Sequence, residues 1–321
     1  MPLTTDLQTI TLGPNGPTVP ALGVGTWAWG DSLFWDYGKA YSDSDLHAAF
    51  EACLDAGLTL FDTAEIYGFG KSERLLGQFM QQRPQQAVIA TKYFPLPWRF
   101  SQQSVVDALA ASLDRLQVPS VALYQVHSPL SFLLSQKDLM QALAAEVKQG
   151  RIGAVGVSNY PASQMRQAHG YLAEWGIPLA VNQVQYSLLN RKIETNGVME
   201  AARELGITIL AYSPLAQGLL TGKYTPETDL KPAGARRISP SFSQESLTKL
   251  KPVIQALQTI GEKHERTPAQ VALNWLVAQG NVLPIPGAKN VHQAAQNAGA
   301  LGWQLAVDEV DQLAQLTQNK R

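Results

Sequence analysis

The sequence predicts an α/β fold, a (β/α)8 TIM barrel that takes in residues 1–321 as one domain and begins with a β-hairpin. The first observation is a rhythm of chemically distinctive side chains. They recur at intervals of 30, 35, 31, 25 and 29 residues, each at the end of a short apolar run: Asp62, Lys92, His127, Ser158, Gln183 and Tyr212. One strand with its helix takes roughly 30 residues. These side chains would therefore end successive parallel strands, where such barrels keep their active sites.

The second observation is the repeated use of glycine between helix and strand. Five helical stretches end at a glycine that leads directly into an apolar run: Gly57, Gly150, Gly176, Gly206 and Gly280. Glycine adopts the left-handed backbone that ends a helix at low steric cost. This punctuation indicates alternating strands and helices rather than a helical bundle or a β-sandwich.

The third observation is the number of strand candidates, which equals the number that closes a TIM barrel. We expect strands over residues 21–25, 59–62, 88–92, 121–127, 153–157, 180–184, 208–212 and 282–286. The stretches between them carry apolar residues at helical spacing and would form an outer ring of helices.

Segments outside this rhythm have their own expected places. Two short apolar runs flank the turn residues GPNG at 13–16, which predicts a hairpin that plugs the amino-terminal end of the barrel. The irregular segment from Ser213 to about Ser246 is long enough to be a lid or binding loop. The final segment, residues 307–321, predicts an outer helix from the spacing of its apolar residues Val307, Val310, Leu313 and Leu316.

Composition limits the classes of function. The 25 basic and 26 acidic side chains give a net charge of -1, which argues against a nucleic-acid partner. The sequence has no run of 18 apolar residues, and its first ten residues lack the basic and apolar regions of a signal peptide. We therefore expect a soluble, cytoplasmic protein with a small-molecule partner and no membrane partner. The single cysteine, Cys53, lies on an apolar helical stripe and is expected in the core.

Four reactive side chains would meet in one pocket. Asp62, Lys92 and His127 end neighbouring strands, and Tyr67 follows Asp62 by five residues on the connecting loop. A phenol has a pKa near 10, too high for ready proton exchange at neutral pH. We expect the Lys92 ammonium to lower that pKa, and Asp62 to hold Lys92 charged. The set suits proton donation by Tyr67.

The motifs DTAEIYG, TK at a strand end and LYQVHSP, in this order and spacing, carry a definite resemblance. Along its whole length the chain resembles the aldo-keto reductase superfamily, in particular the bacterial and plastid-type branch. The resemblance implies NAD(P)H-dependent reduction of an aldehyde or ketone without metal or flavin. It implies that Tyr67 is the general acid, that Lys92 and Asp62 tune it, and that His127 orients the carbonyl.

The resemblance also implies an NADPH site at the same strand ends. Ser158, Asn159 and Gln183 would hold the carboxamide of the nicotinamide, and Tyr212 would stack on its ring. The remaining expected contacts are Gly25, Thr26, Trp27, Asp62, Ser213, Leu215, Gly218, Leu219, Lys223, Pro286, Gly287, Lys289, Gln293 and Asn297. Amides beside glycine and at the start of the helix after Asn290 attract anionic oxygens. Lys289 is the candidate for the 2′-phosphate of NADP, and no GxGxxG motif supports a Rossmann domain.

Aromatic residues on two loops are candidates for the substrate walls, since aromatic walls bind flat or apolar molecules. We expect Trp29, Trp35 and Trp98 to take this role. Arg99 could add a site for an anionic group. The opposing interpretation is that these aromatic residues only pack the loops together.

Each catalytic candidate also has a structural interpretation. Lys92 and Asp62 alone would be an ordinary ion pair, Tyr67 a loop tyrosine that caps the barrel, and His127 alone a hydrogen-bonded structural histidine. Together, at three consecutive strand ends, they favour catalysis. No HxH, HExxH or Cys/His cluster accompanies His127, so we expect no metal. The other histidines, at 47, 169, 264 and 292, are expected on solvent-facing helix surfaces.

Three alternative functions follow from the resemblance and the fold. The potassium-channel β subunits share the fold and the loop style AYSPL…GLLTGKY, so an NADPH-binding regulatory subunit with slow turnover is one alternative. A pyridoxal-specific reductase is a narrower enzymatic alternative. A phosphosugar isomerase is disfavoured, because it would leave the Tyr, Lys, Asp and His group without a role.

Overall fold

A computed structural model describes residues 7–318 except 131–132, 229, 231 and 233. Within these residues a parallel sheet of eight strands runs in chain order: β3 (Val24–Gly25), β4 (Leu60–Asp62), β5 (Val88–Tyr93), β6 (Val121–Val126), β7 (Ile152–Ser158), β8 (Leu179–Gln185), β9 (Thr208–Tyr212) and β10 (Val282–Pro284). The sheet closes between its first and last strands. Gly23 N and Gly25 N donate hydrogen bonds of 3.0 Å to Pro284 O and Pro286 O. The predicted (β/α)8 barrel is confirmed.

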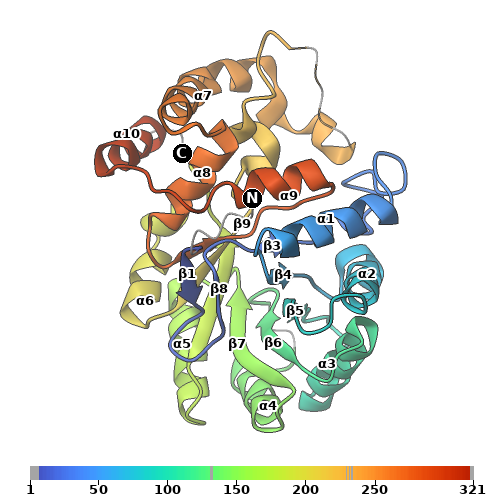
Figure 1. Ribbon diagram of the computed structural model, residues 1–321. Coiled ribbons are helices and arrows are strands. Elements are labelled where there is room, and N and C mark those ends of the chain that lie inside the picture. The colour runs from blue at the N-terminus through green and yellow to red at the C-terminus, as the bar shows by residue number, and fades with distance from the viewer. Residues whose placement is uncertain (1–6, 131–132, 229, 231, 233, 319–321) are drawn as a thin grey trace.

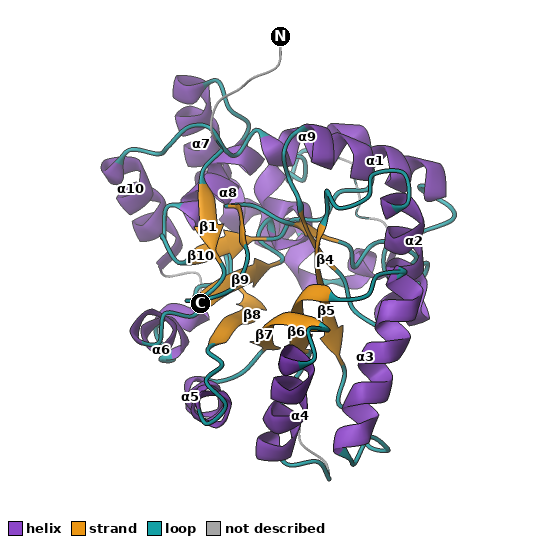
Figure 2. Ribbon diagram, turned by 60° about the horizontal axis from the view of Figure 1, so that its bottom comes forward, coloured by secondary structure: helices purple, strands orange, loops and turns teal. Residues whose placement is uncertain are grey.

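Helices surround the strands on the outside (Figure 2). They are α1 (Asp43–Asp55), α2 (Lys71–Met80), α3 (Gln102–Leu116), α4 (Gln136–Lys148), α5 (Ala162–Ala173), α6 (Val198–Glu204), α8 (Pro268–Val277) and α9 (Val291–Ala298). Helices α7 (Gln244–His264) and α10 (Val307–Gln318) pack beside one another at one end of the molecule (Figure 1). No described helix is long and apolar enough to cross a membrane.

The hairpin of β1 (Thr9–Thr11) and β2 (Thr18–Pro20) enters the base of the barrel, as predicted. Leu12 and Val19 are at most 1% exposed and pack against the first inward-facing residues of the strands, among them Leu60. Gly13 has φ +64°, and a Cβ there would lie 2.5 Å from Ala180 Cα. The hairpin therefore approaches the strands so closely that only glycine fits at this position.

The strand period of two sets the position of the polar residues. On four strands an apolar inward residue is followed, two positions later, by a polar one: Leu60 and Asp62, Ala90 and Lys92, Leu123 and Gln125, Val181 and Gln183. All eight side chains are buried. An apolar layer thus lies beneath a polar layer at the carboxyl ends of the strands.

Some predicted bounds are wrong. The first strand is two residues long instead of five, and the last ends at Pro284 instead of Pro286. Proline has no N–H to donate to a strand ladder, which accounts for the short last strand. Cys53 is buried, as predicted, and burial raises the pKa of its thiol to about 12.

The two irregular or terminal segments agree with the prediction in outline. The segment after β9 contains the 3-10 helices η3 (Ala216–Thr221), η4 (Gly234–Ile238) and η5 (Pro240–Phe242). The final segment forms α10, although Val307 is 79% exposed and Glu309 lies on the buried face instead. Residues 319–321 of the predicted final helix and the start of the chain before Leu7 lie outside the described residues.

Candidate active site

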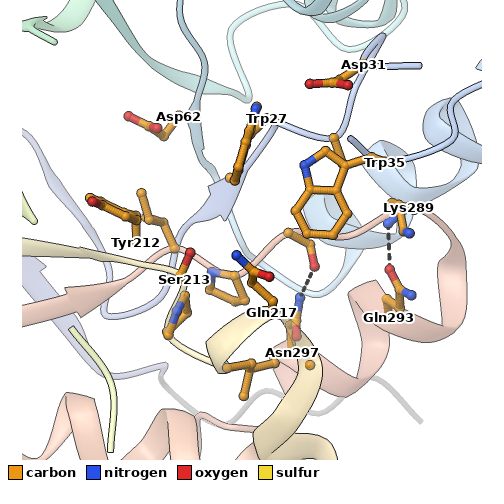
Figure 3. A pocket seen from close by; sticks show the side chains of 18 of the residues that line it. Trp27, Asp31, Trp35, Asp62, Tyr212, Ser213, Gln217, Lys289, Gln293 and Asn297 are labelled. Atoms are coloured by element: carbon orange, nitrogen blue, oxygen red, sulfur yellow. Dashed lines mark hydrogen bonds between the residues drawn. The ribbon is translucent and has the colours of Figure 1, made fainter. Parts of the chain in front are cut away.

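A cavity of about 720 Å³ opens at the carboxyl ends of the strands. It is lined by Tyr67 and His127 and by most of the residues expected to bind the cofactor: Gly25, Trp27, Asp62, Ser158, Asn159, Gln183, Tyr212, Ser213, Leu215, Gly218, Lys223, Pro286, Gly287, Lys289, Gln293 and Asn297. Figure 3 shows Asp62 and Tyr212 on one side of this cavity and Lys289 and Gln293 on the other. Residues from seven predicted strand ends or their loops therefore meet at one cavity.

The ion pair of Lys92 and Asp62 lies beneath the cavity. Lys92 Nζ donates to Asp62 Oδ2 at 2.5 Å, to Thr63 O at 2.8 Å and to the Tyr67 hydroxyl at 3.4 Å. The Lys92 side chain is fully buried. Burial alone would lower the pKa of Lys92, but Asp62 and Tyr67 outweigh it and raise the pKa above its ordinary value. Lys92 therefore stays an ammonium in contact with the phenol.

Asp62 is held by two glutamines as well as by Lys92. Gln125 Nε2 and Gln183 Nε2 donate to Asp62 Oδ1 at 2.9 and 2.8 Å, and Gln183 also donates to Gln125 Oε1 at 3.1 Å. Sequence reasoning missed Gln125. The signal was present, because Gln125 follows Leu123 by two residues and therefore faces inward on the same strand.

The pKa of Tyr67 contradicts the prediction. Burial raises the pKa of this phenol above its ordinary value of 10, and the lowering by Lys92 does not compensate. Asp62 opposes Lys92 because its carboxylate neutralises much of the ammonium charge. Tyr67 therefore keeps its proton, a state suited to an acid.

His127 borders Tyr67 and is uncharged at neutral pH. Their rings meet edge to face with centroids 5.6 Å apart. Burial, with a smaller contribution from Lys92, lowers the pKa of His127 to about 3. The ring can donate one hydrogen bond to a carbonyl oxygen without carrying a charge.

Amide and hydroxyl groups lie beside the catalytic candidates. Ser158 Oγ donates to Gln183 O at 2.9 Å, and Asn159 Nδ2 donates to Ser158 Oγ at 3.0 Å. The Tyr212 hydroxyl donates to Asn159 Oδ1 at 3.1 Å. Asn159 has a left-handed backbone with φ 61°, a conformation that asparagine tolerates. This turn brings the side chains of two consecutive residues into one group at the cavity wall.

Cations gather at the other side of the cavity. The charged side chains of Lys223, Arg236 and Lys289 line it, and His292 lines it as well. Burial lowers the pKa of Lys289 to about 8, with further lowering by Arg236 and Lys223. The Trp35 ring packs against both cations, 4.7 Å from the guanidinium of Arg236 and 5.4 Å from Lys289 Nζ. Mutually repelling, partly buried cations of this kind favour binding of a polyanion.

Arg236 and His292 were missed by the sequence reasoning. Arg236 lies on η4, in the irregular segment after β9, where no periodicity indicates which side chains face inward. His292 is exposed, as expected, but it also lines the cavity, because it lies in the first turn of α9, which begins there. Its place beside Gln293 was the available signal.

Besides Lys92, which lies beneath the cavity, four expected site residues do not line it. Thr26 is buried beneath it, where its hydroxyl pairs with Ser72 Oγ at 2.8 Å, and Leu219 is buried in the core. Trp29 cannot contact a substrate, because it is 0% exposed and its Nε1 donates to Ala288 O. Trp98 is 68% exposed on the loop after β5. Of the three tryptophans proposed as substrate walls, Trp35 alone lines the cavity.

Two further expectations are corrected by side-chain partners. Arg99 is paired with Glu65, so it is not an open anion site. The imidazole of His264 does not simply face solvent, because its Nε2 lies 2.8 Å from Glu309 Oε2 and its ring packs on Trp303.

Known proteins are similar to this chain in sequence and in architecture. The model of the aldo/keto reductase family matches residues 21–318. A chloroplastic pyridoxal reductase of Arabidopsis thaliana is 41% identical over 325 residues, which cover 98% of this chain and 87% of the relative. The aldo-keto reductase yakc (NADP(+)) of Schizosaccharomyces pombe is 33% identical over a region that covers 94% of this chain and 89% of that protein.

Solved structures agree with the sequence relatives. The crystal structure of an aldo-keto reductase from Klebsiella pneumoniae in complex with NADPH superposes with a TM-score of 0.76 at 28% identity, over 97% of this chain and 98% of the other. The chain therefore belongs to the aldo/keto reductase family and is an NAD(P)H-dependent oxidoreductase acting on carbonyl groups.

Proposed function

We propose that the protein reduces an aldehyde or ketone to the alcohol with NADPH, and that Tyr67 is the general acid. The observation that carries this proposal is the contact of Lys92 with both Asp62 and Tyr67 beneath the cavity. A charged ammonium at the phenol stabilises the phenolate that remains once the proton has left. This arrangement suits proton donation by Tyr67. An ion pair with a structural role alone would not need the contact with the phenol.

Each residue has a distinct task in the proposed reaction. Bound NADPH supplies the hydride, and this chain's residues manage the proton and the geometry. The neutral His127 donates a hydrogen bond that orients the carbonyl oxygen beside Tyr67. Tyr67 gives its proton to that oxygen as the alcohol forms. Lys92, held by Asp62, then faces the phenolate until a proton returns.

The cofactor would extend across the whole cavity. Ser158, Asn159 and Gln183 offer donors and acceptors of the kind that hold a carboxamide, and Tyr212 offers an aromatic face. At the opposite side Lys289 and its cationic neighbours suit the 2′-phosphate that distinguishes NADPH from NADH. The lowered pKa of Lys289 supports this, because a desolvated cation among other cations gains stability when an anion joins it.

Pyridoxal is a specific second candidate for the substrate. The supporting observation is the 41% identity to the Arabidopsis thaliana protein named a pyridoxal reductase. Steady-state rates with pyridoxal, compared with those for 4-nitrobenzaldehyde, distinguish a specialist from a broad carbonyl reductase. A kcat/KM for pyridoxal no higher than for the generic aldehyde would rule out the specialist.

The first test is titration with NADPH and NADH by fluorescence, followed by addition of 4-nitrobenzaldehyde. We expect NADPH to bind more tightly and to be oxidised steadily. Binding with turnover slower than NADPH release would favour a regulatory subunit instead.

The Tyr67→Phe variant should lose turnover by about 10²-fold or more because it lacks the proton donor, while its NADPH affinity stays unchanged. Retained turnover would refute the role of Tyr67.

A further inference from the structure

Glu65 lies on the same loop as Tyr67, two residues before it, but does not line the cavity. Its carboxylate is largely buried, with 7% of the side chain exposed. Glu65 Oε1 accepts hydrogen bonds from Phe94 N at 2.6 Å and from Arg99 Nη1 at 2.5 Å, and Glu65 Oε2 accepts one from Arg99 Nη2 at 2.8 Å. The loop that carries Tyr67 is therefore joined to the loop after β5.

Arg99 completes a clamp around Phe94. Its Nη1 donates to Phe94 O at 2.9 Å, so the N–H of Phe94 is held by Glu65 and its carbonyl by Arg99. The guanidinium also packs over the ring of Tyr93, 5.1 Å from the centroid. Only arginine offers the planar fork needed for a two-point contact with a carboxylate.

Phe94 and Tyr93 are the neighbours of His127. The Phe94 ring meets the His127 ring edge to face with centroids 5.5 Å apart, and His127 N donates to Tyr93 O at 2.8 Å. On its other side His127 meets the ring of Tyr67. The Glu65–Arg99 pair thus connects, through one clamped residue, the two groups proposed to receive the carbonyl oxygen.

We propose that Glu65 and Arg99 are a positioning pair, which sets the distance between the Tyr67 hydroxyl and the His127 ring. The inference rests on the proposed function. A misplacement of about 1 Å can cost about 10²-fold in rate when two groups must meet one reacting atom. Loosening the clamp should therefore slow hydride and proton transfer. Cofactor binding should be spared, because the expected cofactor contacts lie mainly on the ends of β7 to β10.

Single-turnover kinetics separate positioning from stability. Enzyme in excess over NADPH, so that all of the nucleotide is bound, is mixed with excess 4-nitrobenzaldehyde, and the rate constant of NADPH oxidation is recorded. This rate constant does not depend on the fraction of enzyme that is folded, whereas steady-state kcat does. NADPH affinity and the thermal midpoint are measured alongside for each variant.

The variants are Glu65→Gln, Arg99→Met, their combination, and Arg99→Lys. We expect the rate constant to fall about tenfold in Glu65→Gln and Arg99→Met, and to fall no further in the combination, because the two residues act as one unit. Arg99→Lys keeps the charge and one bond, so it should recover part of the rate. It also provides a measurable variant should the uncharged ones fail to fold.

A matched control comes from the opposite end of the barrel. Glu146, in the last turn of α4, and Arg151, directly before β7, form an ion pair of similar burial, with side chains 1% and 29% exposed. Glu146→Gln should lower the thermal midpoint and leave the single-turnover rate constant unchanged.

The outcomes separate the two proposals. A rate constant within twofold of the wild type in both Glu65→Gln and Arg99→Met, or in Arg99→Lys if those do not fold, would overturn the positioning pair alone. An equal fall in Glu146→Gln would also overturn it, since any buried ion pair would then have the same effect. Failure of the wild type to oxidise NADPH would overturn the proposed function and this inference with it.

Discussion

Lys289→Met tests the proposed cofactor most directly, because NADPH and NADH differ only in the 2′-phosphate. Methionine keeps an apolar stem of similar length and removes the ammonium, which lies over the rings of Trp35 and Tyr41. A hydrogen bond to a charged partner contributes about 1.5–3 kcal/mol. Since about 1.4 kcal/mol is a factor of ten, NADPH should bind roughly 10- to 100-fold more weakly, and NADH about as before.

The pH dependence gives an independent check on the same residue. The pKa of Lys289 is about 8, so the side chain is protonated at pH 7 and largely neutral at pH 9.5. The cationic form is the one that binds a phosphate, so binding of the phosphate raises the pKa of Lys289 again. NADPH affinity should therefore fall as pH rises above about 8, by at most tenfold per pH unit for one linked proton. NADH affinity should stay nearly flat.

Fluorescence titrations with both nucleotides from pH 7 to 9.5 measure these effects. In Lys289→Met the fall of NADPH affinity above pH 8 should disappear. Lys137→Met, which removes an exposed lysine paired with Glu174, serves as the control and should change neither affinity. Equal weakening of NADPH and NADH in Lys289→Met would place this lysine away from the 2′-phosphate and refute the reasoning.

Three further predictions concern single residues. Phe69 has a left-handed backbone with φ 53° and is 96% exposed. Phe69→Asn should relieve this backbone strain and raise the free energy of unfolding by about 0.5–1 kcal/mol, as measured by urea unfolding. A loss of stability would contradict backbone strain at this position. Because the pKa of His127 is about 3, the pH profile of kcat/KM for a neutral aldehyde should show no titration of His127 between pH 5 and 8. A step in this profile near pH 6.5 that vanishes in His127→Gln would contradict the low pKa. Leu12→Ala opens a cavity in the base of the barrel and should lower the free energy of unfolding by about 2–4 kcal/mol, while the NADPH affinity stays unchanged. A weaker NADPH affinity would show that the amino-terminal hairpin shapes the cofactor site.

The barrel was predictable because two periods coincide in the sequence. Strand residues alternate between inside and outside, and each strand recurs after one helix, so Asp62 and Lys92 could be placed at neighbouring strand ends without coordinates. The loops follow neither period. Trp29 looked like a wall residue, yet the loop after β3 turns it inward, where it bonds to Ala288 O. Arg236 reaches the cavity from an irregular segment, and no pattern in the sequence indicates that.

The pKa of Tyr67 could not be predicted for a different reason, because burial and the neighbouring charge of Lys92 shift it in opposite directions. The sequence shows that an ammonium lies near the phenol, but the net shift depends on how completely water is excluded. The apolar layer of Leu60, Ala90 and their neighbours closes the barrel beneath Asp62 and Lys92, so both charges are buried together and largely cancel. Burial then dominates at Tyr67 and keeps its proton in place. It follows that the ammonium matters most after the proton has left, when the phenolate is the charge that Lys92 faces.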